Sequence, residues 1–230
     1  MTAIEYPGAQ PFLPKGMPGL AALAEAARDC RGCDLFERAS QVVFGTGDPN
    51  ARIMLVGEQP GDSEDKQGKP FVGPAGRVLT RALDEAGIAA QDSYVTNAVK
   101  HFRWRDASEG GKRRIHQRPD TWQIRACGPW LSAEIERVHP QVIVPLGSVA
   151  GQALFGASFR VGAHRGRPQP WRLGGKQGDG HSSVGLDCAV VATIHPSAVL
   201  RAGDRDSAYR GLVDDLIVAA NVLNMKAGTK

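Results

Sequence analysis

Four short apolar runs stand out along the chain, separated by longer stretches in which polar and apolar residues mix. Continuous apolar runs of this length are typical of strands that are buried on both faces of a parallel sheet. Glycine or polar residues follow each run and mark its end. We therefore predict four parallel strands, at 52–57 (RIMLVG), 94–99 (YVTNAV), 141–147 (QVIVPLG) and 189–194 (AVVATI).

The stretches between these runs predict helices. Residues 121–138 carry apolar side chains close to a helical period, and residues 74–86 begin with a proline and stop before a glycine. Further helices are predicted over 148–154 and 207–222. Strands that alternate with helices indicate right-handed βαβ units. The predicted fold is therefore α/β, a three-layer α/β/α sandwich with a central four-stranded parallel sheet.

The length of the chain favours one domain over residues 1–230, because 230 residues can bury a core without disulfides. Prolines and glycines predict a loose lead-in over 1–18, and we also expect a loose tail over 224–230. Residues 160–183 lack periodicity, and we interpret them as a distorted hairpin followed by an exposed loop.

The strand ends predict where a site lies, because ligands of such folds bind at the carboxyl ends of the strands. Gly57 and Glu58 follow the first run, and Asn97 and His195 lie at the ends of two others. Glu58 is either a surface acid in a tight turn or a carboxylate beside a ligand. Asn97 is either a turn residue or an amide whose donor and acceptor suit a pyrimidine edge. His195 either ends its strand with a hydrogen bond or donates to a leaving group.

Positive charge is concentrated in three segments, 101–105, 112–118 and 160–172, although the net charge is only +4 and the pI about 9.0. Such clustering favours a polyanion partner such as DNA. We expect phosphate contacts from Lys112, Arg113 and Arg118. His116 lies within the same basic stretch (GGKRRIHQRP), where its imidazole can act as a nucleophile near neutral pH.

No apolar run approaches the roughly 20 residues that span a bilayer, so we expect no membrane partner. The first residues lack the basic start and apolar stretch of a secretory signal, and we expect a cytoplasmic monomer. Thiols stay reduced there, so the Cys-x-x-Cys of Cys30 and Cys33 indicates metal binding or catalysis rather than a disulfide. Phe71 stands in a Gly/Pro-rich loop, where its ring can serve as a stacking platform for a base, worth about 1–3 kcal/mol.

Taken in order, the motifs GEQPGD, GKPFVGPAG, YVTNAVK, VIVPLG and HPS resemble the iron–sulfur uracil-DNA glycosylases of the thermophile type. The KRRIH stretch resembles their UdgX branch, and the motifs cover about residues 30–200. The resemblance implies that Phe71 stacks on a flipped-out uracil, that Asn97 reads its polar edge and that His195 hydrogen-bonds its O2. It places Glu58 near the sugar. The further substrate contacts that we expect from these motifs are Gly57, Gln59, Asp62 and Ser197; Gln59 replaces the glycine common in the thermophile type, which fits the UdgX pattern.

The same resemblance implies a [4Fe-4S] cluster held by Cys30, Cys33, His101 and Cys127. His101 stands where the relatives carry their third ligand, directly after the YVTN-x-x-K strand, and histidine has precedent as an iron–sulfur ligand. Cys188 has no counterpart in the pattern and is expected to be a buried thiol outside the set. Two alternatives stay open: ligation by all four cysteines, and a structural zinc ion.

These residues together predict uracil excision from DNA, with single strands preferred, followed by attack of His116 on C1′ of the abasic sugar. Glu58 or Arg114 would orient the imidazole, and the protein would end as a permanent adduct after one turnover. One alternative is a conventional multiple-turnover glycosylase in which His116 contacts phosphate. Another is a non-catalytic iron–sulfur module that binds DNA.

Overall fold

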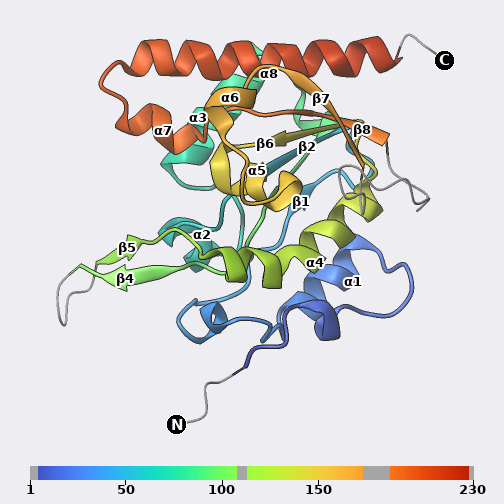
Figure 1. Ribbon diagram of the computed structural model, residues 1–230, viewed down its shortest axis with the longest axis vertical. Helices are drawn as coiled ribbons and strands as arrows, with labels where there is room; N and C mark the ends of the chain where they lie inside the picture. Colours follow the sequence, from blue (N-terminus) through green and yellow to red (C-terminus); the bar gives the residue numbers. More distant parts are fainter. Residues whose placement is uncertain (1–4, 108–112, 173–186, 228–230) are drawn as a thin grey trace.

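The computed structural model describes residues 5–107, 113–172 and 187–227 (Figure 1). Within these residues a six-stranded sheet has the order β1-β3-β2-β6-β8-β7. Its four central strands are parallel, which confirms the prediction. They are β2 (Ile53–Gly57), β3 (Ser93–Asn97), β6 (Val142–Pro145) and β8 (Asp187–Val191).

Two antiparallel edge strands, β1 (Thr46–Gly47) and β7 (Pro168–Arg172), extend the sheet beyond the predicted four. Neither has an apolar run: β1 is two residues long, and β7 carries two prolines. Proline cannot donate to a ladder and is confined to sheet edges. The sequence analysis did not predict the edge strands because it relied on apolar runs, which only strands buried on both faces have. The predicted hairpin at 160–183 contributes α6 (Val161–His164) and β7, which pairs with β8; residues 173–186 lie outside the described part.

Helices cover both faces of the sheet, as the three-layer prediction requires (Figure 1). Ile53 and Leu55 of β2 pack with α3 (Pro74–Glu85) and α8 (Arg205–Ala227). The alternate residues Met54 and Val56 pack on the opposite face, with α4 (Thr121–Val138) and α5 (Gly147–Phe155). This two-residue alternation gives each face of the sheet its own apolar core. The remaining helices are α1 (Leu20–Ala27), α2 (Asp62–Gln67), α7 (Pro196–Arg201) and the 3-10 turns η1 (Gln10–Phe12), η2 (Asp34–Glu37) and η3 (Ala90–Asp92).

The structure describes residues 5–18 of the predicted lead-in and residues 224–227 of the predicted tail. In the lead-in, the N–H of Gly8 donates to Gly32 O at 3.0 Å and that of Ala9 to Ala126 O at 2.8 Å. A methyl group on Gly32 would lie 2.5 Å from the Gly8 carbonyl carbon, so a glycine permits this contact. At the other end α8 continues to Ala227, well into the predicted tail. In the ranges that the structure describes, no helix could cross a membrane.

A separate two-stranded hairpin stands beside the sheet, where the sequence predicts a basic loop (Figure 1). It consists of β4 (Trp104–Asp106) and β5 (Arg114–His116), which pair antiparallel. Lys112, a predicted phosphate contact, falls in the connecting segment 108–112 and lies outside the described residues. The hairpin matters for function because its second strand ends on His116.

Candidate active site

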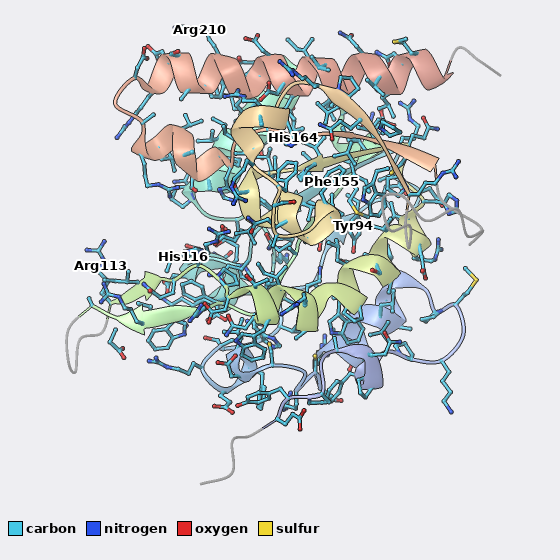
Figure 2. All side chains as sticks on the ribbon, in the orientation of Figure 1. Tyr94, Arg113, His116, Phe155, His164 and Arg210 are labelled. Atoms are coloured by element: carbon cyan, nitrogen blue, oxygen red, sulfur yellow. The ribbon has the colours of Figure 1, made fainter. Side chains whose placement is uncertain are left out.

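A cavity of about 670 Å³ opens at the carboxyl ends of the central strands. Glu58 follows β2, Asn97 ends β3 and His195 precedes α7, so the predicted edge of the sheet supplies three walls. His116 reaches the same cavity from the hairpin (Figure 2). Of the residues expected to act on a substrate, those that line it are Glu58, Gln59, Asp62, Phe71, Asn97, His116, His195 and Ser197.

Gly57 lies behind the cavity wall, at the point where Asn97 and Phe71 meet. Its neighbour across the parallel ladder is Asn97. A methyl group at Gly57 would lie 2.3 Å from Asn97 Oδ1 and 2.6 Å from Phe71 Cζ. Both distances are far below van der Waals contact, so only glycine allows the amide and the ring to approach the strand so closely.

Phe71 is held in a left-handed backbone conformation, with φ of 55°. Such a conformation costs a non-glycine residue about 1 kcal/mol or more, so neighbouring contacts must impose it. The Glu64 carboxylate accepts the N–H of Gly61 at 3.1 Å and that of Gly73 at 2.7 Å, which closes the loop carrying Phe71. The ring then stacks on His195, with centroids 6.1 Å apart.

Glu64 is a site residue that the sequence analysis missed. It lines the cavity and is nearly buried, yet its role is to fix the loop rather than to face a substrate. The sequence feature that marks it is a Glu three residues after the residue that precedes the helix, as in one half of a capping box. That spacing is common enough that it predicts a helix start and nothing about a site.

His195 is fixed as a neutral hydrogen-bond donor. Its Nδ1 accepts the backbone N–H of Ser197 at 3.1 Å and lies 2.8 Å from the Ser197 hydroxyl, whose oxygen in turn accepts from Arg201 at 3.1 Å. An Nδ1 that accepts leaves the ring hydrogen on Nε2. Burial, with help from Arg201 and His116, lowers the pKa of His195 to about 4. The ring therefore stays neutral at physiological pH.

Glu58 and His116 face each other across the cavity wall. Glu58 Oε1 lies 3.6 Å from His116 Nε2, beyond hydrogen-bond distance. This oxygen is buried and has no hydrogen-bond partner among the described residues. Burial raises the pKa of Glu58, an effect that Arg118 and Arg201 oppose. Burial and the charge of Arg201 lower the pKa of His116, so its imidazole is neutral near pH 7.

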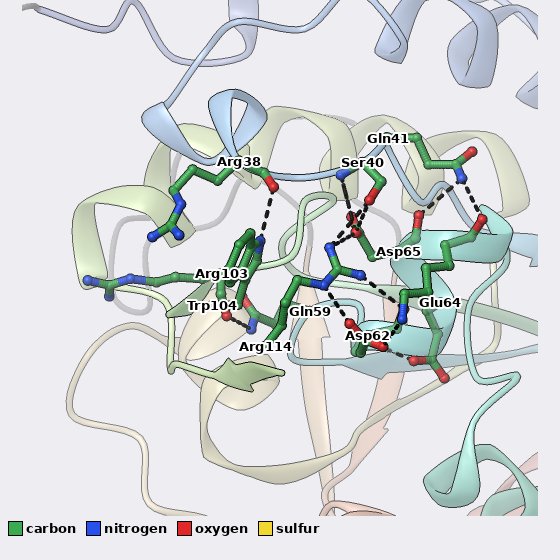
Figure 3. Close-up of polar contacts among 12 residues, drawn as sticks. Arg38, Ser40, Gln41, Gln59, Asp62, Glu64, Asp65, Arg103, Trp104 and Arg114 are labelled. Atoms are coloured by element: carbon green, nitrogen blue, oxygen red, sulfur yellow. Dashed lines mark hydrogen bonds and ion pairs between the residues drawn. The ribbon is translucent and has the colours of Figure 1, made fainter. Parts of the chain in front are cut away.

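Arg114 fastens the hairpin to α2 (Figure 3). Its Nε donates to Asp62 at 2.5 Å and its Nη1 to Asp65 at 2.6 Å. Asp65 is fully buried and also accepts from Ser40. The guanidinium is thus occupied by two carboxylates, and the acidic group beside the His116 imidazole is Glu58.

Gln59 fastens the base of the hairpin, although the sequence analysis expects it to contact substrate. Its Nε2 donates to Arg103 O at 3.1 Å and to Gln117 O at 3.0 Å, and its Oε1 accepts the Arg103 N–H at 3.1 Å. The amide therefore uses both of its donor hydrogens on hairpin backbone. Gln59 borders the cavity, and its polar atoms bind the backbone of Arg103 and Gln117, which flank the two hairpin strands. Figure 3 shows Gln59 beside Arg103.

Comparison with known proteins agrees with this arrangement. The sequence profile of the Uracil DNA glycosylase superfamily matches residues 44–217. This chain belongs to the uracil-DNA glycosylase superfamily. It is 36% identical to a type-4 uracil-DNA glycosylase of Thermotoga maritima over 207 residues, which cover 90% of this chain and 95% of the relative. It is 33% identical to the type-4 uracil-DNA glycosylase of Saccharolobus solfataricus, over 80% of this chain and 78% of the relative.

A further relative aligns with about half of this chain. The type-5 uracil-DNA glycosylase of Thermus thermophilus is 34% identical over 145 residues, which cover 53% of this chain and 61% of the relative. The superfamily match spans β2, the hairpin and α7, and therefore all the elements that build the cavity.

Two of the predicted phosphate contacts, Arg113 and Arg118, flank the hairpin strand β5. Arg113 is exposed beside β5 (Figure 2). Arg118 is also exposed, donates to Gln152 at 2.7 Å and is close enough to lower the pKa of Glu58. A further cation that the sequence analysis missed, Arg201 of α7, lines the cavity itself.

Three of the four cysteines meet in one buried cluster between the N-terminal segment and α4. They are Cys30, Cys33 and Cys127. The N–H of Lys100 donates to Cys127 Sγ, and Trp130 Nε1–H donates to Cys30 Sγ, both at 3.3 Å. Burial raises the pKa of Cys127 to about 12, and the other two sulfurs add to the rise. The sulfurs are therefore near one another, in surroundings that supply N–H donors to thiolates.

His101 and Cys188 differ in their relation to this cluster. His101 is buried directly after Lys100, and burial lowers its pKa to about 4, which leaves a neutral ring able to ligate a metal. Cys188 packs in a different core, 3.8 Å from Trp171 O. In the described part of the chain no three His, Cys, Asp or Glu residues are spaced to hold a single metal ion. Thiolate and imidazole are both ligand types that iron–sulfur clusters accept.

Proposed function

We propose that this protein excises uracil from DNA and then stays attached, through His116, to C1′ of the abasic deoxyribose. The observation that carries this proposal is the imidazole of His116 at the cavity, with Nε2 3.6 Å from the unpaired Glu58 oxygen. A phosphate held by His116 would be repelled by the carboxylate of Glu58, so this position is unfavourable for a phosphate contact. The resemblance of KRRIH to the UdgX branch supports the same conclusion.

The cavity suits an extruded base. A base cannot be cut from within a stacked duplex, so the nucleotide must flip out or be single-stranded already. The volume of about 670 Å³ lies within the roughly 300–1,000 Å³ of small-molecule sites. Phe71 offers the stacking surface, the Asn97 amide reads the polar edge, and His195 donates its Nε2 hydrogen to O2. Because unstacking is the main cost of entry, we propose a preference for single strands.

Excision breaks the bond between C1′ and N1, and the electron pair leaves with uracil. The resulting anion is stabilised by the neutral donors His195 and Asn97, which are held in place before the reaction. The sugar becomes oxocarbenium-like, and the Glu58 carboxylate opposes its positive charge. Burial in the cavity wall strengthens this interaction because the local dielectric constant is low.

Capture forms one bond, between His116 Nε2 and C1′. The lone pair of the neutral imidazole attacks, the ring then loses its Nδ1 hydrogen, and that proton balances the one that uracil gains. A positioned nucleophile has an effective concentration of about 10⁵ M or more, against which free water at about 55 M competes poorly. The reaction therefore ends with one adduct and one free uracil per protein molecule.

A denaturing gel tests the proposal. Equimolar protein and a uracil-containing single-stranded oligonucleotide should give a species that survives heat and detergent, and a thymine oligonucleotide of the same sequence should give none. Repeated release of uracil without that species would establish the conventional glycosylase instead. If neither free uracil nor an adduct forms, the remaining alternative is a non-catalytic module that binds DNA. The same assay on a duplex tests the strand preference.

The pH dependence of excision should report Glu58. The carboxylate must be ionised to oppose the cation, and burial raises its pKa above the ordinary value of 4.5. Excision should therefore lose rate as the pH falls through a value above 4.5. His195 does not cause this loss, because its pKa of about 4 keeps it neutral over that interval. Single-turnover rates of uracil release should show an acid limb that is absent from a slower Glu58→Gln variant. An unchanged acid limb in that variant would assign the titration elsewhere.

We also propose that Cys30, Cys33, His101 and Cys127 hold a [4Fe-4S] cluster. These residues would hold the cluster between the N-terminal segment and α4, where it would serve to link the two, and no step of excision is assigned to it. Purified protein should show visible iron–sulfur absorbance and bound iron, and Cys127→Ser should lose both. Cys188→Ser is the matched control and should keep them, because Cys188 packs in another core. Loss of the absorbance and iron in Cys188→Ser would favour ligation by all four cysteines. A colourless protein that contains zinc would favour the structural zinc ion.

A further inference from the structure

Trp104 is the partner of His116 across the hairpin. The two residues lie directly opposite each other in the β4–β5 ladder. Side chains of such a pair share one face, with Cβ atoms about 4.5–5.5 Å apart. A shift of Trp104 therefore shifts the strand that carries His116.

The Trp104 ring is held by contacts to the body of the protein (Figure 3). Its indole N–H donates to Arg38 O at 3.0 Å, and the Arg38 guanidinium lies over the ring at 4.1 Å. Arg38 directly follows η2, in the segment that begins with the cysteine pair. An indole that is both hydrogen-bonded and covered by a cation is fixed in two directions.

The contacts continue from Trp104 to the imidazole. The Arg114 guanidinium lies 5.3 Å from the Trp104 ring and 5.3 Å from the Phe102 ring. The Phe102 ring in turn lies 5.9 Å from that of His116. Three side chains, those of Trp104, Arg114 and Phe102, therefore connect the Arg38 backbone to the imidazole through a hydrogen bond, two cation–π contacts and a ring–ring contact.

Trp104 holds the hairpin from a position that does not border the cavity. Gln59 and Asp62 both line it, so their substitution alters the walls that surround a base. The contacts of Trp104 described above are to Arg38, Arg114 and the opposite strand, so we expect its substitution to leave Glu58 and the other groups proposed for excision in place. Trp104 can therefore affect the imidazole separately from uracil release.

We propose that Trp104 is a positioning residue for covalent capture: it holds the hairpin where the His116 imidazole reaches C1′, and it takes no part in excision. This inference rests on the proposed function of His116. Its physical basis is that a misplacement of about 1 Å can cost a reaction about 10²-fold, and here any delay lets water take the sugar first.

The test is the partition between adduct and free abasic DNA in single-turnover reactions with a uracil-containing single-stranded oligonucleotide. Trp104→Phe keeps an aromatic ring but removes the N–H donor to Arg38. We expect its adduct-to-abasic ratio to fall about tenfold, while uracil release changes by less than about twofold. Trp104→Ala should lower the ratio further.

Asp106→Asn is the matched control. Asp106 lies on the same strand and contacts the same arginine, through an ion pair whose side chains are 45% and 52% exposed. Such exposed pairs contribute little, so the ratio should match that of the wild type. Far-ultraviolet circular dichroism and melting temperatures establish that each variant is folded.

The outcomes separate the two proposals. If the wild type forms an adduct and both Trp104 variants partition as it does, the positioning role is wrong and the role of His116 stands. If the variants lose uracil release and adduct in proportion, Trp104 is merely structural and the inference again fails. If the wild type itself releases uracil without forming an adduct, the proposed capture fails, and the inference with it.

Discussion

Replacing His116 with serine should abolish the covalent species while uracil is still released. Serine is shorter, and its hydroxyl is a weak nucleophile at its ordinary pKa. The groups proposed for excision, Glu58, Asn97 and His195, are untouched, and water enters the space left by the imidazole. We expect the adduct to form at least about 10³-fold more slowly, with uracil release now able to exceed one equivalent. Denaturing gels and uracil counts on one reaction measure both quantities.

The control for this variant is His139→Asn. His139 caps the end of α4 with φ of 57°, a conformation that asparagine tolerates, and it does not line the cavity. Its substitution should leave the adduct and uracil release unchanged. Crosslinking by His116→Ser at the wild-type rate would mean that another group attacks the sugar.

Gly57→Ala should lower uracil excision by about 10²-fold, although the added group is a single methyl. The methyl would overlap Asn97 Oδ1 and Phe71 Cζ, which lie 2.3 and 2.6 Å from its position. Both side chains must move, so the amide that reads the base and the ring that stacks on it are displaced together. Single-turnover excision rates and inhibition by free uracil, which should weaken in parallel, measure the effect.

Gly162→Ala provides the comparison for that variant. Gly162 lies in α6, away from the cavity, and a methyl group there meets nothing within 4 Å. It should excise uracil at the wild-type rate. If Gly57→Ala remains folded and binds free uracil as tightly as the wild type, the pocket does not lie against β2 and the assignment of Asn97 and Phe71 is wrong.

The sheet could be predicted from the sequence because its central strands are apolar throughout. In β2, all five residues are buried, and no polar residue interrupts the run. The position of the cavity followed from the polar residues after these strands, Glu58, Asn97 and His195. A rule that depends on buried runs finds only elements that are buried on both faces.

The hairpin could not be predicted because its strands consist mainly of polar and charged residues. β5 reads Arg-Ile-His, and Arg114 becomes nearly buried only because Asp62 and Asp65 neutralise it. Those carboxylates lie about fifty residues earlier in the chain, so no local window contains both partners. Tertiary ion pairing accompanies a strand in a stretch that the sequence shows only as basic.

The role of Gln59 was hidden for a related reason. The motifs predict a contact with substrate, and the structure adds that its amide hydrogen-bonds the backbone of Arg103 and Gln117. A side-chain amide can hydrogen-bond the backbone of any residue, so the residue types of its partners do not predict the contact. Glu64 likewise binds two glycine N–H groups, and only coordinates place these pairs together.

Mass spectrometry of the adduct tests the central claim most directly. Wild-type protein that has reacted with a uracil-containing single strand is digested with nuclease and protease, and the modified peptide is fragmented. We predict that the abasic deoxyribose is attached to the imidazole of His116, with uracil recovered in equal amount. Attachment to any other side chain, or a reacted protein of unmodified mass, would contradict the account.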